Sequence, residues 1–296
     1  MSERVGIVGV GLMGQAFANH LLEKGYEVQG FDVDAARMEQ FRQRGGIPVD
    51  SAAAAARGAR FVLTSLPTGE IVRTAVFGPR GIAESAARGT LVADTSTSRP
   101  QDSEALGAEL AARGIGFLDA AVSGTSAMAW KRDLVVIAGG TEADFEACRP
   151  YFATFSRAAY RMGPIGSGVL TKLIINLILN GNRLALAEGL VLGMKAGVEG
   201  ESLLNVLQDS ACSSKTMIDK GPKMLQGEYA PEGKVHSSLK GARLTLDQGS
   251  RFGAPMLITS LWAQIQQAAF QKGLGDYDSV AYFEVLRELA GLPKRV

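Results

Sequence analysis

A glycine-rich turn near the start of the chain constrains the fold more than any other feature. The β-branched run 4–8 leads into Gly-Val-Gly-Leu-Met-Gly at residues 9–14, and the next apolar run ends at Asp32, eighteen residues after Gly14. A GxGxxG turn between a strand and a helix, followed by an acidic residue at the end of the next strand, is typical of a Rossmann-type βαβ unit. We therefore expect a parallel sheet covered by helices.

Each part of this turn has an expected role in binding a dinucleotide. Gly9 permits the tight turn, and Gly11 lets backbone amides approach a pyrophosphate. Gly14 lets the helix pack closely on the strand. Leu12 and Met13 begin the helix, whose N-terminus favours negative charge through its free N–H groups and its dipole. The turn thus predicts a pyrophosphate site.

The acidic residue after the second strand bears on the choice of cofactor. Asp32 is placed to accept hydrogen bonds from the adenosine ribose and to repel a 2′-phosphate, which favours NAD over NADP. The alternative is that Asp32 only caps the following helix, although Asp34 is better placed to do so. Arg37 is nearby and leaves NADP open as a second possibility.

The rest of the chain divides into two patterns. Up to residue 162, short β-branched runs alternate with helical patterns such as 13–24, 52–56 and 101–113, whereas helix follows helix after Gly163-Pro164. We expect an α/β, Rossmann-type, mostly parallel sheet domain at 1–163, and an all-helical domain at 164–296 that begins with a long helix. The predicted strands are 4–8, 27–32, 60–66, 90–94, 115–119, 134–138 and 158–162.

The long helix, 167 to about 196, is apolar on nearly every side. Such a helix is normally buried by its neighbours, so we expect it to be the spine of the second domain, with help from another subunit. Further helices are predicted at 201–209, 240–248, 255–272 and 280–290.

Composition excludes several classes of protein. The 296 residues include 31 Lys+Arg and 30 Asp+Glu, a net charge of +1 that offers no broad basic surface to nucleic acid. Two cysteines, Cys148 and Cys212, without a CxxC, disfavour a disulfide framework and a cysteine zinc site. No secretion signal is visible, and polar residues interrupt the long apolar helix. We expect a soluble, cytoplasmic protein without a membrane or nucleic-acid partner.

A polar stripe crosses the long apolar helix. Lys172, Asn176 and Asn180 recur every four residues and so share one face. Desolvation by apolar neighbours is expected to lower the pKa of such a lysine and suit it to acid/base work. The alternative is that the lysine reaches solvent and the asparagines satisfy buried backbone groups. The only histidines, His20 and His236, are expected to have packing and solvent-exposed roles respectively.

Several motifs in this order resemble the β-hydroxyacid dehydrogenase family, which includes 3-hydroxyisobutyrate dehydrogenase and tartronate semialdehyde reductase. The resemblance spans essentially the whole chain. Its motifs are residues 9–14, Leu66-Pro67, the Asp-Thr-Ser-Thr-Ser-Arg-Pro run at 94–100, the Asp-Ala-Ala-Val-Ser-Gly run at 119–124, and Gly-Ser-Gly at 166–168 leading to Lys172 and Asn176.

The resemblance implies an NAD(P)-dependent oxidoreductase that moves a hydride between NAD and a small β-hydroxy acid or the corresponding semialdehyde or keto acid, without a metal. It also implies a homodimer or homotetramer. Lys172 looks like the family's catalytic lysine and Asn176 like its substrate-holding asparagine. Ser123 and Gly124 would bind the substrate carboxylate, with Thr125 beside them. The residues that would contact the cofactor are Gly9, Gly11, Leu12, Met13, Gly14, Asp32, Leu66, Pro67, Thr97 and, near the nicotinamide, Lys240.

The chain departs from the family pattern at positions that matter for the choice of substrate. Thr125, Met128 and Arg132 stand where glycines usually occur, and Ile175 and Gly241 replace a common asparagine and aspartate. We expect these changes to favour a small carboxylate other than 3-hydroxyisobutyrate, with Thr125 or Arg132 reaching a second polar or anionic group.

Two other functions remain open. An imine reductase of the same fold usually lacks the lysine, and a non-catalytic dinucleotide-binding protein would not need the set formed by Ser123, Lys172 and Asn176. A hydrolase is not supported, because the sequence contains no GxSxG motif.

Overall fold

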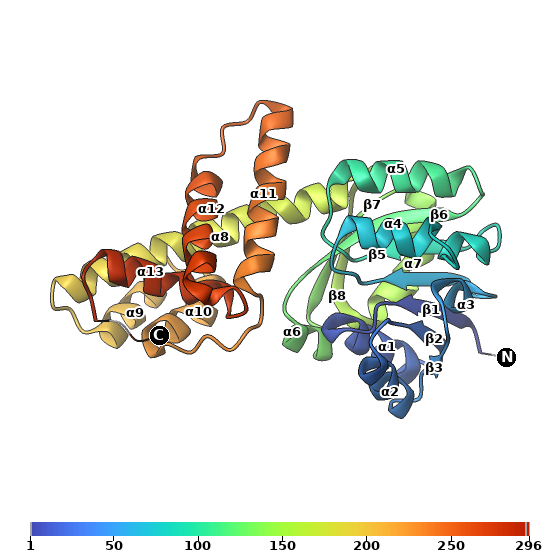
Figure 1. The fold of residues 1–296 in the computed structure, drawn as a ribbon, viewed down its shortest axis with the longest axis horizontal. Helices are drawn as coiled ribbons and strands as arrows, with labels where there is room; N and C mark the ends of the chain where they lie inside the picture. Colours follow the sequence, from blue (N-terminus) through green and yellow to red (C-terminus); the bar gives the residue numbers. More distant parts are fainter. Residues whose placement is uncertain (1, 294, 296) are drawn as a thin grey trace. The chain divides into compact units, whose positions relative to one another are not determined.

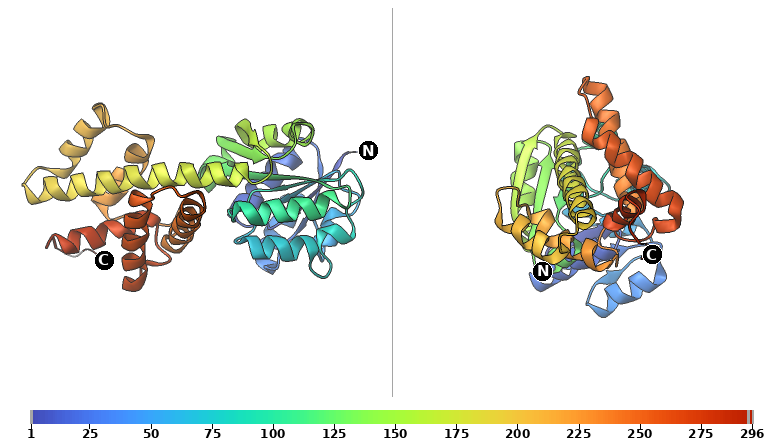
Figure 2. Two further views of the ribbon diagram at one scale, coloured as in Figure 1. Left: turned by 90° about the horizontal axis from the view of Figure 1, so that it is seen from above. Right: turned by 90° about the vertical axis from the view of Figure 1, so that its left-hand side faces the viewer.

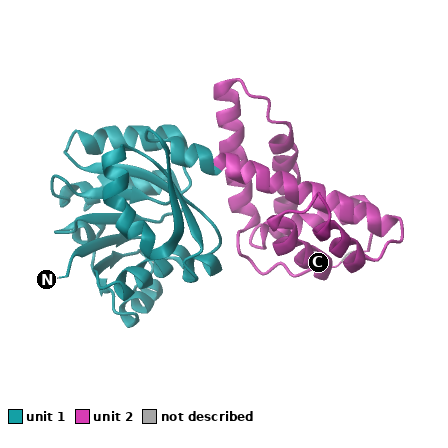
Figure 3. Ribbon diagram, turned by 180° about the vertical axis from the view of Figure 1, so that it is seen from behind, with its two compact units in different colours: residues 1–172 teal, residues 173–296 magenta. Residues whose placement is uncertain are grey.

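A computed structural model describes residues 2–293 and 295 of the chain. By its internal contacts the chain forms two compact units, Met1–Lys172 and Leu173–Val296, which Figure 3 colours separately. The start of the long helix therefore groups with the sheet by contact. The division of the chain at residue 163 stays a prediction.

Unit 1 contains one eight-stranded sheet in the order β3-β2-β1-β4-β5-β6-β7-β8 (Figure 1). All neighbouring strands are parallel except β6 and β7, which are antiparallel. The predicted Rossmann-type, mostly parallel sheet is confirmed. The strands are β1 Arg4–Val8, β2 Glu27–Phe31, β3 Ile47–Pro48, β4 Phe61–Thr64, β5 Leu91–Asp94, β6 Gly116–Ser123, β7 Leu134–Gly139 and β8 Ser156–Gly163.

Helices cover both faces of the sheet because its central strands are apolar on both sides. Along β4, Phe61 and Leu63 belong to the core on one face and Val62 to the core on the other, as the two-residue repeat of a strand requires. The first face packs against α1 (Leu12–Glu23), α6 (Ser126–Trp130) and α7 (Glu142–Phe155). The second packs against α3 (Ala52–Ala56), α4 (Gly69–Phe77) and α5 (Pro100–Ala111).

The sequence prediction missed the edge strand of unit 1 but anticipated the cap of the helix after β2. The edge strand β3 has only two residues, one of them Pro48, and is too short for a periodic pattern. The helix α2 (Ala35–Gln43) begins at Asp34, whose side chain accepts hydrogen bonds from the N–H groups of Ala36 and Arg37. Asp34, and not Asp32, is therefore the cap of this helix.

The long helix α8 (Ser167–Lys195) begins against the sheet, and a buried carboxylate holds its first turn. Asp119 of β6 is fully buried, and its two oxygens accept hydrogen bonds from the N–H groups of Gly166 (2.8 Å) and Val169 (2.7 Å). Gly168 abuts β6 and β7 so closely that a Cβ there would lie 2.4 Å from the carbonyl oxygen of Asp119. Asp119 thus replaces the local N-cap side chain that Gly166 cannot supply.

Unit 2 is helical, as predicted, and packs around a core that includes Trp262 and Tyr282. The helix at 240–248 is longer than predicted and starts early enough to contain His236, which is exposed on its first turn. The sequence prediction missed α10, because its Gly221-Pro222 pair normally ends a helix. The helices are α9 Gly200–Asp209, α10 Lys215–Gln226, α11 Val235–Phe252, α12 Leu257–Ala269 and α13 Tyr282–Leu289, with short turns of other helix types at Ile82–Glu84, Phe270–Leu274 and Ser279–Ala281.

The helix α8 is continuous over 29 residues (yellow in Figure 2), but its own chain leaves much of it uncovered. Only 22% of its most apolar window is buried within the chain, so contacts inside one chain do not bury it, and its burial with help from another subunit stays a prediction. Among the described residues, one helix, α8, is long and apolar enough to cross a membrane, judged by length and composition only. Its polar stripe and its anchor on Asp119 distinguish it from an ordinary membrane span.

The buried carboxylate of Asp119 leads to a prediction about stability. Burial raises the pKa of Asp119 to about 6, although the hydrogen bonds from Val169 and Gly166 oppose the shift. In an unfolded chain an aspartate titrates near pH ~3.9. Between these values the folded protein keeps a proton that the unfolded chain has lost, so stability should fall as the pH rises through this window.

We expect the difference in free energy of unfolding between wild type and Asp119→Asn to move by about 3 kcal/mol in favour of the variant from pH 4 to pH 7. Urea titrations at a series of pH values measure this difference. Asp209→Asn, on the surface of α9, serves as the control. If the difference in free energy of unfolding stayed constant over this pH range, the two hydrogen bonds would offset the effect of burial on the pKa of Asp119.

Candidate active site

The loops after β1, β4 and β5 meet at the carboxyl edge of the sheet. Gly9 has a φ of +91°, and a Cβ there would lie 2.3 Å from the carbonyl oxygen of Ser65, so only glycine fits. The N–H of Leu66 donates to Oγ of Ser96 (2.9 Å), which ties the loop after β4 to the loop after β5. The structure thus brings together three of the loops that the sequence assigns to the cofactor.

The N-terminus of α1 has the features of an anion site. A Cβ on Gly14 would lie 2.0 Å from the carbonyl oxygen of Gly9, which explains the close packing of α1 on β1. A Cβ on Gly11 would meet only Nη1 of Arg37 at 3.7 Å, so the space beside this residue is open. The first turn, with exposed Leu12, carries neither a side-chain cap nor an acidic residue. These residues therefore fit the pyrophosphate of a dinucleotide.

Asp32 lies directly after β2 and is engaged with the glycine turn. Its Oδ2 accepts from the N–H of Val10 (2.9 Å) and its Oδ1 from the N–H of Asp34 (3.0 Å). Nη1 of Arg37 is 3.7 Å from Oδ2. The carboxylate therefore holds the turn in shape, and an acidic and a basic side chain lie together where an adenosine ribose would bind.

The other predicted cofactor residues lie on the same edge. Pro67 is exposed and Thr97 is half-buried. The loop that carries Thr97 is fixed by Asp94, whose Oδ1 accepts from Oγ1 of Thr64 (2.7 Å) and from the N–H of Ser96 (3.0 Å). Beside this loop a cavity of about 310 Å³ opens between α4 and α5, lined in part by Ser98 and Arg99.

Ser123, Gly124 and Thr125 form the turn from β6 into α6. Oγ1 of Thr125 accepts from the N–H of Met128 (3.3 Å), so this hydroxyl is the cap of α6 and keeps its own hydrogen to donate. The Met128 side chain lies over the turn, with Cε 3.4 Å from the Cβ position of Gly124. Both replacements of glycine therefore have a structural role here.

Arg132 does not act as the sequence prediction suggested. Its Nη2 donates to Oε2 of Glu23 (2.5 Å) and its Nε to Nδ1 of His20 (3.2 Å). Its φ of +58° is a left-handed conformation, which costs a residue with a Cβ about 1–2 kcal/mol and explains why glycine suits this position. Because its charge is paired with α1, the hypothesis that Arg132 reaches a substrate anion is wrong.

The polar stripe on α8 is present as predicted by its spacing. Lys172, Asn176 and Asn180 are half-buried. Lys172 comes one turn after Val169, which Asp119 holds, so the sheet fixes the start of the helix that carries the lysine. Within the described residues the side chain of Asn176 makes no hydrogen bond.

The remaining candidates lie elsewhere. His20 is buried, with Nε2 2.9 Å from the carbonyl oxygen of Ala129, and has the expected packing role. Lys240 is half-buried on α11 in unit 2. Across residues 2–293 and 295, no group of three His, Cys, Asp or Glu side chains could hold a metal ion.

Sequence reasoning missed two residues that bear on the site. Asp119 was quoted only as part of a motif, and no pattern in the chain predicts its bonds to residues 47 and 50 positions further on. Arg183 extends the stripe of Lys172, Asn176 and Asn180 by one more turn, and the same helical spacing could have identified it.

Comparison with known proteins agrees with this architecture. Residues 4–163 match the family model described as the NAD binding domain of 6-phosphogluconate dehydrogenase. Residues 166–286 match the model described as NAD-binding of NADP-dependent 3-hydroxyisobutyrate dehydrogenase.

Individual relatives match over nearly their whole length. The chain is 30% identical to 2-(hydroxymethyl)glutarate dehydrogenase of Eubacterium barkeri, covering 98% of this chain and 97% of the relative. It is 29% identical to 3-sulfolactaldehyde reductase of Escherichia coli, covering 99% and 98%. Among solved structures, Mycobacterium tuberculosis 3-hydroxyisobutyrate dehydrogenase with L-serine superposes with a TM-score of 0.89 at 27% identity, covering 97% of this chain and 100% of that one. The chain therefore belongs to the β-hydroxyacid dehydrogenase family of NAD(P)-dependent oxidoreductases, which act on CH–OH groups.

Proposed function

We propose that this protein transfers a hydride between NAD and a small β-hydroxy acid or the corresponding semialdehyde or keto acid, with Lys172 as the general acid/base. In this proposal residues 1–163 bind the cofactor, and residues 164–296 provide substrate contacts and the oligomer interface. The observation that carries the proposal is the stripe on α8, where Lys172 and Asn176 share one face of a helix whose first turn is bonded to the sheet through Asp119.

The chemistry follows from what these side chains can do. In the oxidative direction, neutral Lys172 takes the hydroxyl proton while the hydrogen on the same carbon leaves with its electron pair, and the C–O bond becomes a carbonyl. Bound NAD⁺ supplies the acceptor for that hydride. Asn176 donates a hydrogen bond that holds the hydroxyl oxygen, since its amide has no partner among the described residues. In reduction, Lys172 returns the proton.

The substrate carboxylate is assigned to the turn Ser123-Gly124-Thr125. The Thr125 hydroxyl accepts from Met128 but retains a hydrogen to donate, so it offers the carboxylate an additional donor. Met128 packs over Gly124 and narrows the turn. These contacts support a substrate other than unmodified 3-hydroxyisobutyrate. Related chains named for 2-(hydroxymethyl)glutarate and 3-sulfolactaldehyde are consistent with that view.

The function is tested by following the absorbance of reduced cofactor with a panel of acids that share the β-hydroxy acid group. We expect turnover by the wild type, and a loss of about 10²- to 10⁴-fold in kcat for Lys172→Ala with NAD affinity nearly unchanged. Lys195→Ala, at the exposed end of the same helix, is the matched control and should keep wild-type kcat. If the kcat of Lys172→Ala stayed within a few-fold of the wild-type value, another group would have to transfer the proton.

The cofactor preference follows from Asp32 and Arg37. We expect a higher kcat/KM with NAD than with NADP, because the Asp32 carboxylate repels a 2′-phosphate. Asp32→Ser should shift the preference toward NADP, since it removes the repelling carboxylate. It also leaves Arg37, which lies 3.7 Å from Asp32 and 3.3 Å from Asp34, with one carboxylate fewer to pair with. Adding Arg37→Ala to Asp32→Ser should cancel that gain. A wild-type enzyme that prefers NADP would refute this assignment.

We propose a cytoplasmic homodimer or homotetramer, and the apolar surface of unit 2 supports the association. Ile174 and Ile178 of α8 are 48% and 55% exposed, and Leu257 and Leu261 of α12 are 81% and 53% exposed. Gly181 lies against Ile258, so α8 and α12 contribute to one surface. Exposed apolar side chains in this number mark an association surface, and a second copy of the chain is the partner proposed.

Light scattering coupled to size-exclusion chromatography tests this assembly. We expect the wild type to elute as a dimer or tetramer and Leu257→Glu/Leu261→Lys to dissociate, because charges would have to be buried in the interface. Leu289→Lys replaces an equally exposed leucine of α13 and should leave the assembly intact. A monomeric wild type would exclude the proposed interface.

A further inference from the structure

Arg183 continues the polar stripe of α8 beyond the residues assigned to the reaction. It comes seven residues after Asn176 and three after Asn180, so all three side chains share one face of the helix. An arginine is a long cationic side chain with five N–H donors and no acceptor. A cationic side chain in this position is expected to bind an anion.

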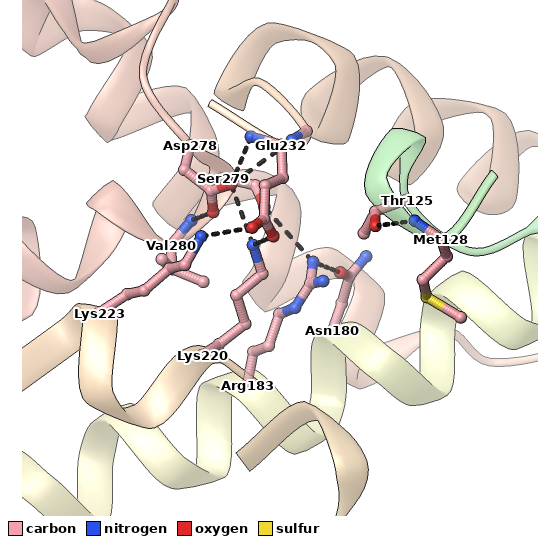
Figure 4. A network of polar contacts seen from close by, with 11 residues as sticks. Thr125, Met128, Asn180, Arg183, Lys220, Lys223, Glu232, Asp278, Ser279 and Val280 are labelled. Carbon is pink, nitrogen blue, oxygen red and sulfur yellow. Dashed lines mark hydrogen bonds and ion pairs between the residues drawn. The ribbon is translucent and has the colours of Figure 1, made fainter. Parts of the chain in front are cut away.

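The contacts of Arg183 within the chain are weak. Its Nη1 donates to Oδ1 of Asn180 at 3.3 Å and to Oγ of Ser279 at 3.4 Å, both longer than usual for N–H to oxygen bonds (Figure 4). Its Nε is enclosed and has no hydrogen-bond partner. Among the residues described, no carboxylate lies within ion-pair distance of Arg183.

Two acidic groups near Arg183, Asp278 and Glu232, are already bonded to other partners. Asp278 accepts from Nζ of Lys220 (3.0 Å) and from the N–H groups of Glu232 (3.0 Å) and Val280 (3.1 Å). The Glu232 carboxylate pairs with Lys220 (2.8 Å) and Lys223 (2.6 Å). Figure 4 shows this cluster beside Arg183, with its hydrogen bonds directed to the two lysines and the backbone. The cluster therefore balances its own charge and supplies no counterion to Arg183.

Arg183 is half-buried with its Nε enclosed, and an enclosed cation without a counterion is costly, so proteins normally pair such groups. Burial lowers the pKa of Arg183, and the negative charge of Asp278 only partly opposes it. The side chains of Asn176 and Asn180 add further donors on the same face, and neither amide nitrogen has a partner among the described residues. The stripe thus presents several hydrogen-bond donors that have no acceptor or only a distant one.

The geometry points to Arg183, with the amide of Asn180, as the receptor for a second anionic group of the substrate. This inference rests on the proposed function, because the reacting hydroxyl is placed at Lys172 and Asn176. Asn180 lies one helical turn beyond Asn176, about 6 Å along the axis at about 1.5 Å per residue. That spacing suits a β-hydroxy acid that carries a second carboxylate or a sulfonate a few carbons from its reacting hydroxyl.

Binding tests the inference independently of turnover. Calorimetric titrations of NAD-saturated wild type compare glutarate with butyrate, which have similar length but differ in one carboxylate. We expect glutarate to bind at least tenfold more tightly, and Arg183→Gln to weaken glutarate about 10- to 100-fold while weakening butyrate much less, since charge-assisted bonds are lost only by the diacid. Arg251→Gln removes the same charge from the exposed end of α11 and is the control.

Steady-state kinetics give the second readout. With 2-(hydroxymethyl)glutarate and 3-hydroxyisobutyrate, Arg183→Gln should lower the kcat/KM ratio of diacid to monoacid through KM and leave the oligomeric state unchanged. Arg183→Lys should rescue only part of the ratio, because an ammonium lacks the planar fork. If Arg183→Gln weakened the binding of glutarate and butyrate equally, or dissociated the oligomer, Arg183 would be a structural residue and the inference would be overturned. Tight glutarate binding without turnover of any hydroxy acid would instead refute the proposed function alone.

Discussion

The bond between a buried carboxylate and the start of a helix organises this molecule. Asp119 sits in the middle of β6, and its two oxygens hold the N–H groups of Gly166 and Val169. The interaction satisfies two of the donors that every helix start leaves open, and it joins the start of α8 to the sheet through β6. Gly168 allows this approach because a Cβ there would collide with the backbone of both β6 and β7. The position of Lys172, one turn later, depends on this joint.

Local sequence patterns were sufficient for much of the fold because the relevant forces act locally. The two-residue repeat of β4, the glycine turn after β1 and the cap at Asp34 follow from strand geometry, backbone sterics and N–H satisfaction at single elements. The sequence did not predict the short strand β3 or the helix α10, which contains Gly221-Pro222, because both elements depend on tertiary contacts. A Cβ at Gly221 would lie 2.6 Å from Cδ1 of Leu204, so α9 requires glycine where a helix pattern alone would not place it.

The same distinction applies to the site. Helical spacing located Lys172 and Asn176 on one face, since that relation is fixed by the helix itself. Spacing could not show that Arg132 pairs with Glu23, because that contact links residues 109 positions apart. Nor did the sequence show which arginine lacks a counterion. Arg183 was visible only as an interruption of an apolar run, and its significance depends on Asp278 being bonded to Lys220 and to backbone N–H groups.

The contacts of the turn after β6 and of α8 support the proposal that α8 contributes more to substrate selection than the turn does. In the turn, Thr125 caps α6, Met128 packs over Gly124, and Arg132 neutralises Glu23, so none of the three brings an uncommitted charge. On the helix, Nε of Arg183 and the amide nitrogens of Asn176 and Asn180 have no acceptor inside the described chain, and Nη1 of Arg183 makes only two long hydrogen bonds. Unsatisfied polar groups discriminate strongly, because a ligand that lacks the matching group leaves them desolvated and unpaired. The two proposals together predict that the number of anionic groups in the substrate matters more for selection than the size of its apolar part.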